Sequence, residues 1–393
     1  MRRAIATVVL VVGAGCGLSA VGLAPSTDGG AAPDSATVTD GGDVLPDGAV
    51  LDDGATESST DAGLTCDASF ATDPDNCGSC GRSCLGGTCE AGACSVVTVV
   101  GSEKEPQGLA IDSANVYWTN TGALGDIESC PLTGCTTATG TVLASNLTSP
   151  NAVLSAGGFV YWTNYSASTL QRCNVGGCGQ SPTTVATMSP LSSGFGRLAA
   201  DATTLFFTDA GNQKVHSCPL AGCGGGPATL ATGQNNPWGI AVDDTRVYWV
   251  NDVAATGSVE SCPKAGCGAS NVMKVTLATN QSSARTITID ATHVYWATQV
   301  GGTIMRCAKT GCNDNPQTLS TGLLNPHGIA VDDAFVYFTE RTTNTVKKVP
   351  KAGGMTTVVA DGQNNPFNVV VDAKAIYWTN WVAVTGSIAK IAK

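Results

Sequence analysis

From residue 95 onward, apolar runs and polar turns alternate along the chain in a repeating order. In one copy, an apolar run at 239–243 is followed by a polar turn and by a second apolar run at 247–250. Two further runs at 258–262 and 274–278 complete the unit. β-branched and aromatic residues dominate these runs, which is typical of strands. The first run is apolar throughout, so we expect that strand to be buried on both faces.

The aromatic part of the unit recurs seven times, as "VYWTN" at 116 and 160, "LFFTD" at 205, "VYWVN" at 247, "VYWAT" at 294, "VYFTE" at 336 and "IYWTN" at 376. The first and last copies start 260 residues apart over six intervals, a mean period of about 43. A period of this length with four strands per unit is typical of a β-propeller. The last unit has only three strands, "GSIAKIAK" being its third, and an extra strand, "SVVTVV" at 95–100, precedes the first unit. We therefore predict an all-β fold, a seven-bladed propeller at 95–393 with four-stranded antiparallel blades, closed by this N-terminal strand.

The repeat resembles two families of propeller. "NPWGIAVDDTRVYWVN", at 236–251, is similar to the YWTD repeat of lipoprotein receptors (LDL-receptor class B) and to NHL repeats. The resemblance covers about three quarters of the chain. It departs from YWTD propellers in blade number, which is six there, and in the final Asp, which is kept only as Asp209. Neither family has one reaction, so the resemblance implies a fold and says little about function.

The first residues, "MRRAIATVVLVVGAGC", predict an export signal at 1–15. Arg2 and Arg3 precede an apolar stretch at 4–12 that is too short to span a bilayer. Cys16 follows Gly-Ala-Gly and resembles the lipidated Cys of a bacterial lipobox, although Gly13 stands where such signals usually have Leu. We predict a lipid anchor at Cys16 on an outer-membrane lipoprotein that faces the periplasm or the cell surface. The alternative is cleavage near Ala24 and secretion as a soluble protein.

Two different segments separate the export signal from the propeller. Residues 17–65 hold eight Asp, one Glu, no Lys or Arg and few large apolar groups, so 16–65 is predicted to be a disordered acidic tether. Residues 66–94 form a Cys-rich segment that resembles small "NCGxCGxxC" modules of large bacterial surface proteins. It contains Cys66, Cys77, Cys80, Cys84, Cys89 and Cys94. An exported segment without His favours three disulfides over zinc, and their connectivity stays open.

Five of the blades carry a Cys-x4-Cys pair between the third and fourth strands. The pairs are Cys130–Cys135, Cys173–Cys178, Cys218–Cys223, Cys262–Cys267 and Cys307–Cys312. In the sixth unit Val349 and Gly354 replace both cysteines together, as the loss of a bonded pair would require. We therefore predict five local disulfides. Zinc is the rival interpretation, and it would need pairs from different blades to meet.

Signals of enzymatic chemistry are scarce. The net charge of −11 argues against a nucleic-acid partner, and the chain has only three His. No P-loop, GxSxG, HExxH or dinucleotide fingerprint is present, so we predict no catalytic constellation, cofactor or metal. An Asp recurs at the end of the first strand, as Asp112, Asp201, Asp243, Asp290, Asp332 and Asp372. A ring of carboxylates suggests calcium, but acceptance of backbone N–H bonds in the turn is the preferred interpretation.

One position changes from copy to copy, just before the first strand of each unit. It is occupied by Gln107, Asn151, Gly196, Trp238, Arg285, His327 and Phe367, and we call it the variable position. We place it in loops around one mouth of the central channel, with an outer rim of Trp381, Tyr165, Asp252, Glu340 and Arg341. Two aromatic rings, a guanidinium and an imidazole on consecutive blades suit a carboxylate or a sugar. The alternative is sequence drift on a solvated loop, with Trp238 and Phe367 packed over their own blades.

Two classes of function follow from these patterns. The first is a non-catalytic, cell-surface binding or scaffold protein with an unknown protein or saccharide partner, and with membrane contact only through Cys16. The second is a propeller lyase or hydrolase that uses the channel mouth. There His327 is the candidate acid or base, with Glu340 or Asp252 as its helper within hydrogen-bond reach.

Overall fold

The computed structural model describes residues 69–393, except 123, 136–138 and 189–193. The predicted export signal, the tether, Cys16 and Cys66 lie outside the described residues. Within those residues, no helix is both long and apolar enough to cross a bilayer.

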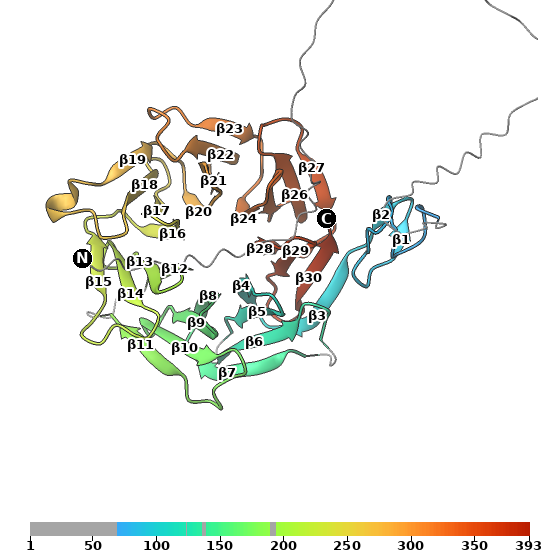
Figure 1. Ribbon diagram of the computed structural model, residues 1–393, viewed down its shortest axis with the longest axis horizontal. Coiled ribbons are helices and arrows are strands. Elements are labelled where there is room, and N and C mark those ends of the chain that lie inside the picture. The colour runs from blue at the N-terminus through green and yellow to red at the C-terminus, as the bar shows by residue number, and fades with distance from the viewer. Residues whose placement is uncertain (1–68, 123, 136–138, 189–193) are drawn as a thin grey trace, which may run out of the picture. The chain divides into compact units, whose positions relative to one another are not determined.

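Seven four-stranded antiparallel sheets are arranged as blades around a central channel (Figure 1). In chain order, blade 1 is β4 (Pro106–Ile111), β5 (Asn115–Asn120), β6 (Gly125–Pro131) and β7 (Thr141–Leu147). Blade 2 is β8 (Pro150–Ala156), β9 (Phe159–Asn164), β10 (Thr169–Asn174) and β11 (Thr183–Thr187). Blade 3 is β12 (Phe195–Ala200), β13 (Thr204–Asp209), β14 (Lys214–Pro219) and β15 (Ala228–Ala231). Blades 4 and 5 are β16 (Pro237–Val242), β17 (Arg246–Asn251), β18 (Ser258–Pro263) and β19 (Val275–Ala278); β20 (Ala284–Ile289), β21 (His293–Thr298), β22 (Thr303–Ala308) and β23 (Gln317–Ser320). Blade 6 is β24 (Pro326–Val331), β25 (Phe335–Glu340), β26 (Thr345–Pro350) and β27 (Thr357–Ala360). A short 3₁₀ helix, η1 (Ala269–Asn271), precedes β19.

The seventh blade joins the two ends of the propeller. Its strands are β28 (Pro366–Val371), β29 (Ala375–Asn380), β30 (Gly386–Ala392) and, from the other end, β3 (Val97–Glu103). β3 pairs antiparallel with β30, with Val97 opposite Lys390. The predicted fold class is therefore confirmed, including the closure by an N-terminal strand.

The core lies between the blades rather than inside any one of them. Successive side chains of a strand point to opposite faces, so the adjacent Tyr and Trp of the second strand face different neighbours. Tyr248 of blade 4 belongs to one buried cluster with Trp296 of blade 5, and Tyr117 of blade 1 to another with Trp162 of blade 2. Seven such clusters are formed, one at each interface between blades. A blade cannot cover its own two faces, which explains why the pattern is repeated until the ring closes.

The recurring Asp residues serve the architecture. Oδ1 of Asp243 accepts the N–H groups of Thr245 and Arg246, both at 2.8 Å, and Oδ2 accepts the hydroxyl of Tyr248 at 2.9 Å. The same carboxylate forms an ion pair at 2.9 Å with Lys309 of the next blade. The ion pair recurs between the following blades, as Lys351–Asp290 and Lys393–Asp332. These carboxylates are therefore engaged in turns and in contacts between blades.

Disulfides close the turns of five blades. They join Cys130–Cys135, Cys173–Cys178, Cys218–Cys223, Cys262–Cys267 and Cys307–Cys312. A chain with this many disulfides belongs to an oxidising, exported environment.

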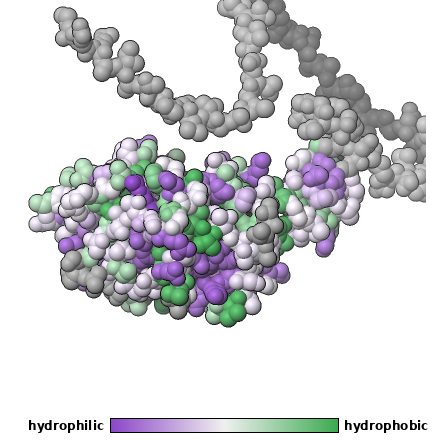
Figure 2. All heavy atoms as spheres, turned by 90° about the horizontal axis from the view of Figure 1, so that it is seen from below, coloured by the Kyte–Doolittle hydropathy of each residue, from purple (hydrophilic) through white to green (hydrophobic). Residues whose placement is uncertain are grey.

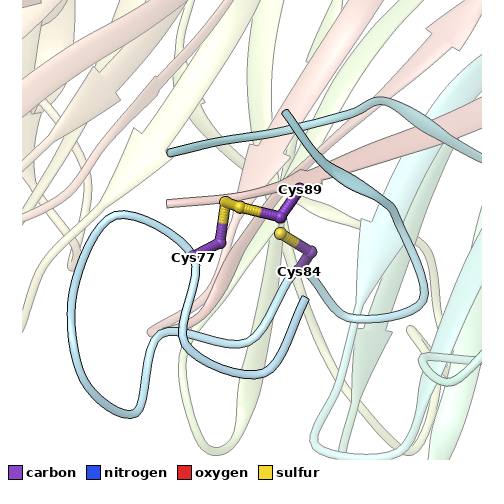
Figure 3. A group of neighbouring side chains, drawn as sticks. All are labelled: Cys77, Cys84 and Cys89. Carbon is purple, nitrogen blue, oxygen red and sulfur yellow. A yellow bond between two sulfur atoms is a disulfide. The ribbon is translucent and has the colours of Figure 1, made fainter. Parts of the chain in front are cut away.

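The Cys-rich segment is held by disulfides as well. Cys77 is bonded to Cys89 and Cys84 to Cys94, around the two-stranded sheet of β1 (Cys89–Glu90) and β2 (Ala93–Cys94), and Cys80 is also disulfide-bonded. The sulfur atoms of Cys77, Cys84 and Cys89 lie within 4.8 Å of one another (Figure 3). Zinc binds thiolates, and these sulfurs are oxidised, so two adjacent disulfides account for the cluster.

Exposed apolar side chains are scattered over the described surface. Leu124, Val272, Val300 and Met355 are among them, and they belong to different blades. In the view of Figure 2, hydrophobic residues are interspersed with hydrophilic ones and no single apolar area dominates. This surface offers no obvious apolar docking face in that view.

Candidate functional site at the channel mouth

The residues of the variable position belong to strands, which corrects their predicted place in loops. Each is the second residue of the innermost strand of its blade, as Trp238 is in β16. Pro237 already pairs with Asn251, and the register then shifts before Ile240 pairs with Trp249. The same shift occurs at the start of the innermost strand in all seven blades. A bulge of this kind re-aims the side chain of the extra residue, so the strand begins earlier than its apolar run suggests.

A turn just before the innermost strand brings the predicted rim next to it. Asn236 has a positive φ of 57°, a conformation that Asn tolerates well. Its carbonyl accepts the N–H of Asp252, at 2.9 Å, from the loop after the second strand. Equivalent bonds join Tyr165 to Ser149 and Trp381 to Asn365. The variable position and the rim therefore meet at the same mouth of the channel.

Hydrogen bonds between blades fix the backbone of this ring. The hydroxyl of Thr208 on blade 3 donates to the carbonyl of Trp238 on blade 4, at 2.5 Å. Thr339 donates in the same way to Phe367, at 2.8 Å. The space is also tight, because a Cβ on Gly239 would lie 2.7 Å from the carbonyl oxygen of Arg285. The side chains at the mouth thus project from a rigid frame.

Four residues of the variable position line one pocket, which we call the mouth pocket. It has a volume of about 300 Å³ and is lined by Gln107, Thr121, Ser149, Asn151, Tyr165, Trp238 and Arg285. The guanidinium of Arg285 lies 4.7 Å from the ring centre of Trp238, and the Tyr165 ring lies 6.3 Å from that of Trp238. Arg285 is also 3.7 Å from the carboxylate of Asp252. Of the four residues predicted to act together, Trp238 and Arg285 therefore line this pocket, and His327 and Phe367 do not.

The other large residues of the variable position stack on one another. The rings of His327 and Phe367 are 3.8 Å apart, and those of Phe367 and Trp381 are 5.6 Å apart. The guanidinium of Arg341 lies about 5 Å from both Phe367 and Trp381, at 5.0 and 5.1 Å. Gly196 has no side chain to contribute. Six of the seven positions thus divide into four that line a polar pocket and two that form an aromatic pair.

His327 is buried and has no carboxylate partner among the described residues. Its side chain is 1% exposed, and its Nδ1 is 3.1 Å from the carbonyl oxygen of Phe367. Burial, followed by the positive charges of Arg197, Arg285 and Arg341, holds the pKa of His327 well below its usual value. The imidazole is therefore neutral at pH 7, with the Nδ1 proton donated to the Phe367 carbonyl.

The predicted role of Glu340 on the rim and as a helper of His327 is wrong. Glu340 is the last residue of β25 and is 1% exposed. Its Oε1 accepts the N–H of Leu324 at 2.6 Å, and its Oε2 is paired with Lys347. Its carboxylate is thus used to hold the end of a strand. Asp252, the other proposed helper, is paired with Arg285 instead.

Several buried polar atoms at the mouth have no hydrogen-bond partner in the described protein. Three belong to residues of the mouth pocket: Nε1 of Trp238, Oδ1 of Asn151 and Nε of Arg285. Trp238 is 8% exposed and Asn151 is 4% exposed. Nε1 of Trp381 is a fourth such atom. Eight further buried side-chain atoms without a partner belong to other described residues, but these three share one pocket, where a bound group can supply the partners that buried polar atoms normally have.

Arg197 is a residue of the site that the sequence analysis missed. It follows Gly196 in β12 and lines a second space, the channel cavity, of about 200 Å³ below the mouth. The equivalent residues of the other blades are Gly108, Ala152, Gly239, Thr286, Gly328 and Asn368. A charged residue at a position otherwise held by small or neutral side chains was the available signal.

Comparison with known proteins supports the fold. No family model matches the chain. A stretch of 56 residues is 30% identical to the Sortilin-related receptor of Homo sapiens, and covers 14% of this chain and 2% of that protein. The receptor of Oryctolagus cuniculus matches to the same extent. The chain therefore spans about 2% of the length of the curated relatives it matches.

Solved propellers are similar over most of both chains. Virginiamycin B lyase from Staphylococcus aureus has a TM-score of 0.61 and 15% identity, over 76% of this chain and 98% of the lyase. A catalytically inactive form of that lyase with Quinupristin has a TM-score of 0.60 and 13% identity, over the same shares. Hydrazine synthase of Kuenenia stuttgartiensis has a TM-score of 0.56 and 13% identity, over 73% of this chain and 95% of that chain. At these identities the chain shares a propeller fold with proteins of unrelated activities.

Proposed function

We propose that this protein is an exported, non-catalytic binding or scaffold propeller that engages its ligand at the channel mouth. The observation that carries the proposal is the set of three unpartnered polar atoms in the mouth pocket. Leaving a buried donor or acceptor unsatisfied costs about 1–3 kcal/mol for each group. A ligand that supplies the missing partners would recover much of that cost on binding.

The chemistry of the mouth pocket limits the kind of group it suits. Trp238 and Arg285 offer N–H donors, and Asn151 offers an acceptor. The rings of Trp238 and Tyr165, tilted by 53° with centres 6.3 Å apart, offer apolar faces for a flat ring or a sugar ring. A volume of about 300 Å³ admits one residue or one sugar unit, not a folded surface. The expected partner is therefore a saccharide, or a protein that inserts one side chain.

A lyase or hydrolase is the second candidate, because virginiamycin B lyase shares the fold and His327 lies at the mouth. Such a reaction needs a general acid or base with an orienting partner. Here Nδ1 of His327 is used by a backbone carbonyl, and Glu340 and Asp252 contact other cations. Binding is the better supported function.

The proposed location at the cell surface rests on the sequence. We propose that a lipid at Cys16, the tether at 16–65 and the Cys-rich segment at 66–94 hold the propeller at 95–393 away from the membrane. A flexible tether of this length reaches roughly 35–40 Å. Growth with a radioactive fatty acid tests the anchor: label on the wild type and none on Cys16→Ala supports it, and an unlabelled wild type contradicts it.

Binding at the mouth is testable by saturation-transfer NMR on the full chain. Phenylacetamide and methyl glucoside, at millimolar concentration, are suitable probes for an aromatic and a sugar ring. We expect at least one probe to bind the wild type and to lose its signal in Trp238→Ala. Met355→Ala, a change at an exposed residue of blade 6, is the matched control and should leave the signal intact. Binding that survives Trp238→Ala, or no binding by any probe, overturns the proposal.

A further inference from the structure

The guanidinium of Arg197 stands in the channel cavity among apolar and neutral side chains. Aliphatic side chains of the innermost strands make up most of the lining, among them Leu109, Ile240, Ile287 and Val369. Arg197 is the one charged residue of this lining, and Thr286 and Asn368 are the other residues with polar side chains. A single cation therefore faces an otherwise apolar channel.

Arg197 is held in place through its backbone, and its side chain has no carboxylate partner among the described residues. Its N–H donates to the hydroxyl of Thr208 at 3.1 Å, the same bond that Gly108 and Gly328 make with their own blades. No ion pair involves Arg197 among those found in the described part of the chain. Burial, together with the charge of Arg285, lowers the pKa of Arg197 to about 10, so it stays protonated at pH 7.

Positive charge also surrounds the way into the cavity. The positive charges of Arg197, Arg285 and Arg341 each help to lower the pKa of His327, and the charge of Arg285 helps to lower the pKa of Arg341. Asp252 pairs with Arg285, and the carboxylate of Glu340 is taken by Lys347. The mouth is thus locally cationic in a chain whose net charge is −11. Arg197 is partly exposed to the channel and has no ionic partner among the described residues, so an anionic ligand in the cavity would supply one.

We propose that Arg197 binds a carboxylate group that enters the channel cavity through the mouth pocket. This inference rests on the proposed binding function of the mouth and names the chemical class of its ligand. The two spaces adjoin: Gly239 and Thr286 line the cavity and directly follow Trp238 and Arg285, which line the mouth pocket. A ligand with a flat body and a carboxylate at its end fits both.

Charge and the number of donors favour a carboxylate over a phosphate. The cavity of about 200 Å³ has roughly the volume of six or seven waters at about 30 Å³ each, so it admits either group and size does not decide. The planar guanidinium matches a carboxylate with two parallel N–H···O bonds, and a single negative charge neutralises it. A phosphate would bring about two charges and would find few other donors in this lining. A small organic acid and an acidic side chain present the same carboxylate chemistry, and the experiment below distinguishes them.

The test compares matched acids and amides on the folded full-length protein. Phenylacetate and phenylacetamide differ only in the charged group, and an acetylated Gly-Gly-Glu-Gly-Gly amide is compared with its Gln analogue. Calorimetry or NMR titration would measure each affinity on the wild type, Arg197→Gln and Arg197→Lys. Hydrogen bonds to charged groups contribute about 1.5–3 kcal/mol, so we expect the wild type to prefer each acid by about 10- to 100-fold. Arg197→Gln should remove the preference, and Arg197→Lys should keep part of it.

The outcomes separate this inference from the proposed function. If acid and amide bind equally and both are lost in Trp238→Ala, the proposal that Arg197 binds a carboxylate is refuted and the proposed binding site at the mouth pocket is retained. An acid preference that survives Arg197→Gln also refutes the carboxylate proposal, whereas no binding by any probe overturns both. A stronger preference in the peptide pair assigns the carboxylate to a protein partner, and a stronger preference in the phenyl pair assigns it to a small acid. Thermal unfolding verifies the fold of each variant, and if Arg197→Gln does not fold, the acid preference of Arg197→Lys decides.

Discussion

Replacement of Glu128 by Gln is expected to stabilise the propeller at alkaline pH. Glu128 lies on β6 and is 7% exposed. It shares the side-chain amide of Asn120 with two other carboxyl groups: Nδ2 of Asn120 is 2.6 Å from Glu103, 2.8 Å from Asp126 and 3.4 Å from Glu128. Glu103 belongs to β3, the strand that closes the ring. The cluster therefore places mutually repelling carboxyl groups next to the closure.

The magnitude follows from the pKa of Glu128. Burial, then the charges of Glu103 and Asp126, raise it from 4.5 to about 8. The folded state thus holds more protons than the unfolded state between pH 4.5 and about 8, and stability falls as the pH rises through that window. A shift of this size corresponds to about 5 kcal/mol if all of it opposes folding. Screening and local relaxation reduce the effect, so we expect Glu128→Gln to add about 2 kcal/mol at pH 9 and little at pH 4.

Differential scanning calorimetry at pH 4, 6 and 9 measures the effect as a change in Tm. Relative to the wild type, Glu128→Gln should gain stability as the pH rises from 4 to 9. Asp361→Asn, a change at an exposed carboxylate, removes one negative charge without touching the cluster and is the control. If Asp361→Asn matches the gain, net charge is responsible. If Glu128→Gln is no more stable than the wild type at pH 9, the reasoning about the cluster is refuted.

Three further changes test the frame of the propeller. Gly239→Ala should lower stability by about 1–3 kcal/mol, because its Cβ would lie 2.7 Å from a carbonyl oxygen of the next blade, whereas Gly176→Ala, with open space around it, should be neutral by calorimetry. Replacing both Cys262 and Cys267 by Ala should cost about 2 kcal/mol in denaturant unfolding, and an unchanged midpoint would show that the disulfide adds nothing. Asp332→Asn tests the ion pair between Asp332 and Lys393 of blade 7. Burial raises the pKa of Asp332, but the bonds from Lys393, main-chain N–H groups and Tyr337 outweigh burial and lower it to about 2. This carboxylate therefore stabilises the fold above pH 4, and its contribution is lost on acidification to pH 2. The variant should lose about 1 kcal/mol at pH 7 and nothing at pH 2, and an equal loss at both would contradict this account.

The fold could be predicted from the sequence because its causes are local and repeated. The Tyr–Trp pair, the turn Asp and the strand lengths are present in most units, so an error in one copy is corrected by the others. The closure by β3 could be predicted from the count of strands alone. By contrast, the start of the innermost strand was misplaced, because the bulge after Pro237 interrupts the alternation that marks a strand.

The site could be predicted only in part, since its contacts join residues of different blades. The variable position was visible, and Trp238 and Arg285 do meet in one pocket. The engagement of Glu340 by Lys347 and by a backbone N–H could not be read from spacing. Arg197 was missed because only the variable position was compared between blades. In blade 3 that position is Gly196, and the charged residue is the one after it.

The same frame explains how the variable position can differ in every blade without loss of the fold. The bonds that hold this ring run through backbone groups: Thr208 donates to the carbonyl of Trp238, and Thr339 to that of Phe367. The side chains of Trp238 and Phe367 take no part in those bonds, whereas a Cβ at Gly239 would lie 2.7 Å from a carbonyl oxygen of the next blade. Blade 3 reverses the pattern: a Cβ at Gly196 would collide with the hydroxyl of Thr208, and the next position holds Arg197, the largest of the seven residues there. Arg197 has no ionic partner among the described residues, which is why we regard it, more than the aromatic residues of the mouth, as the residue whose role most needs a ligand to explain it.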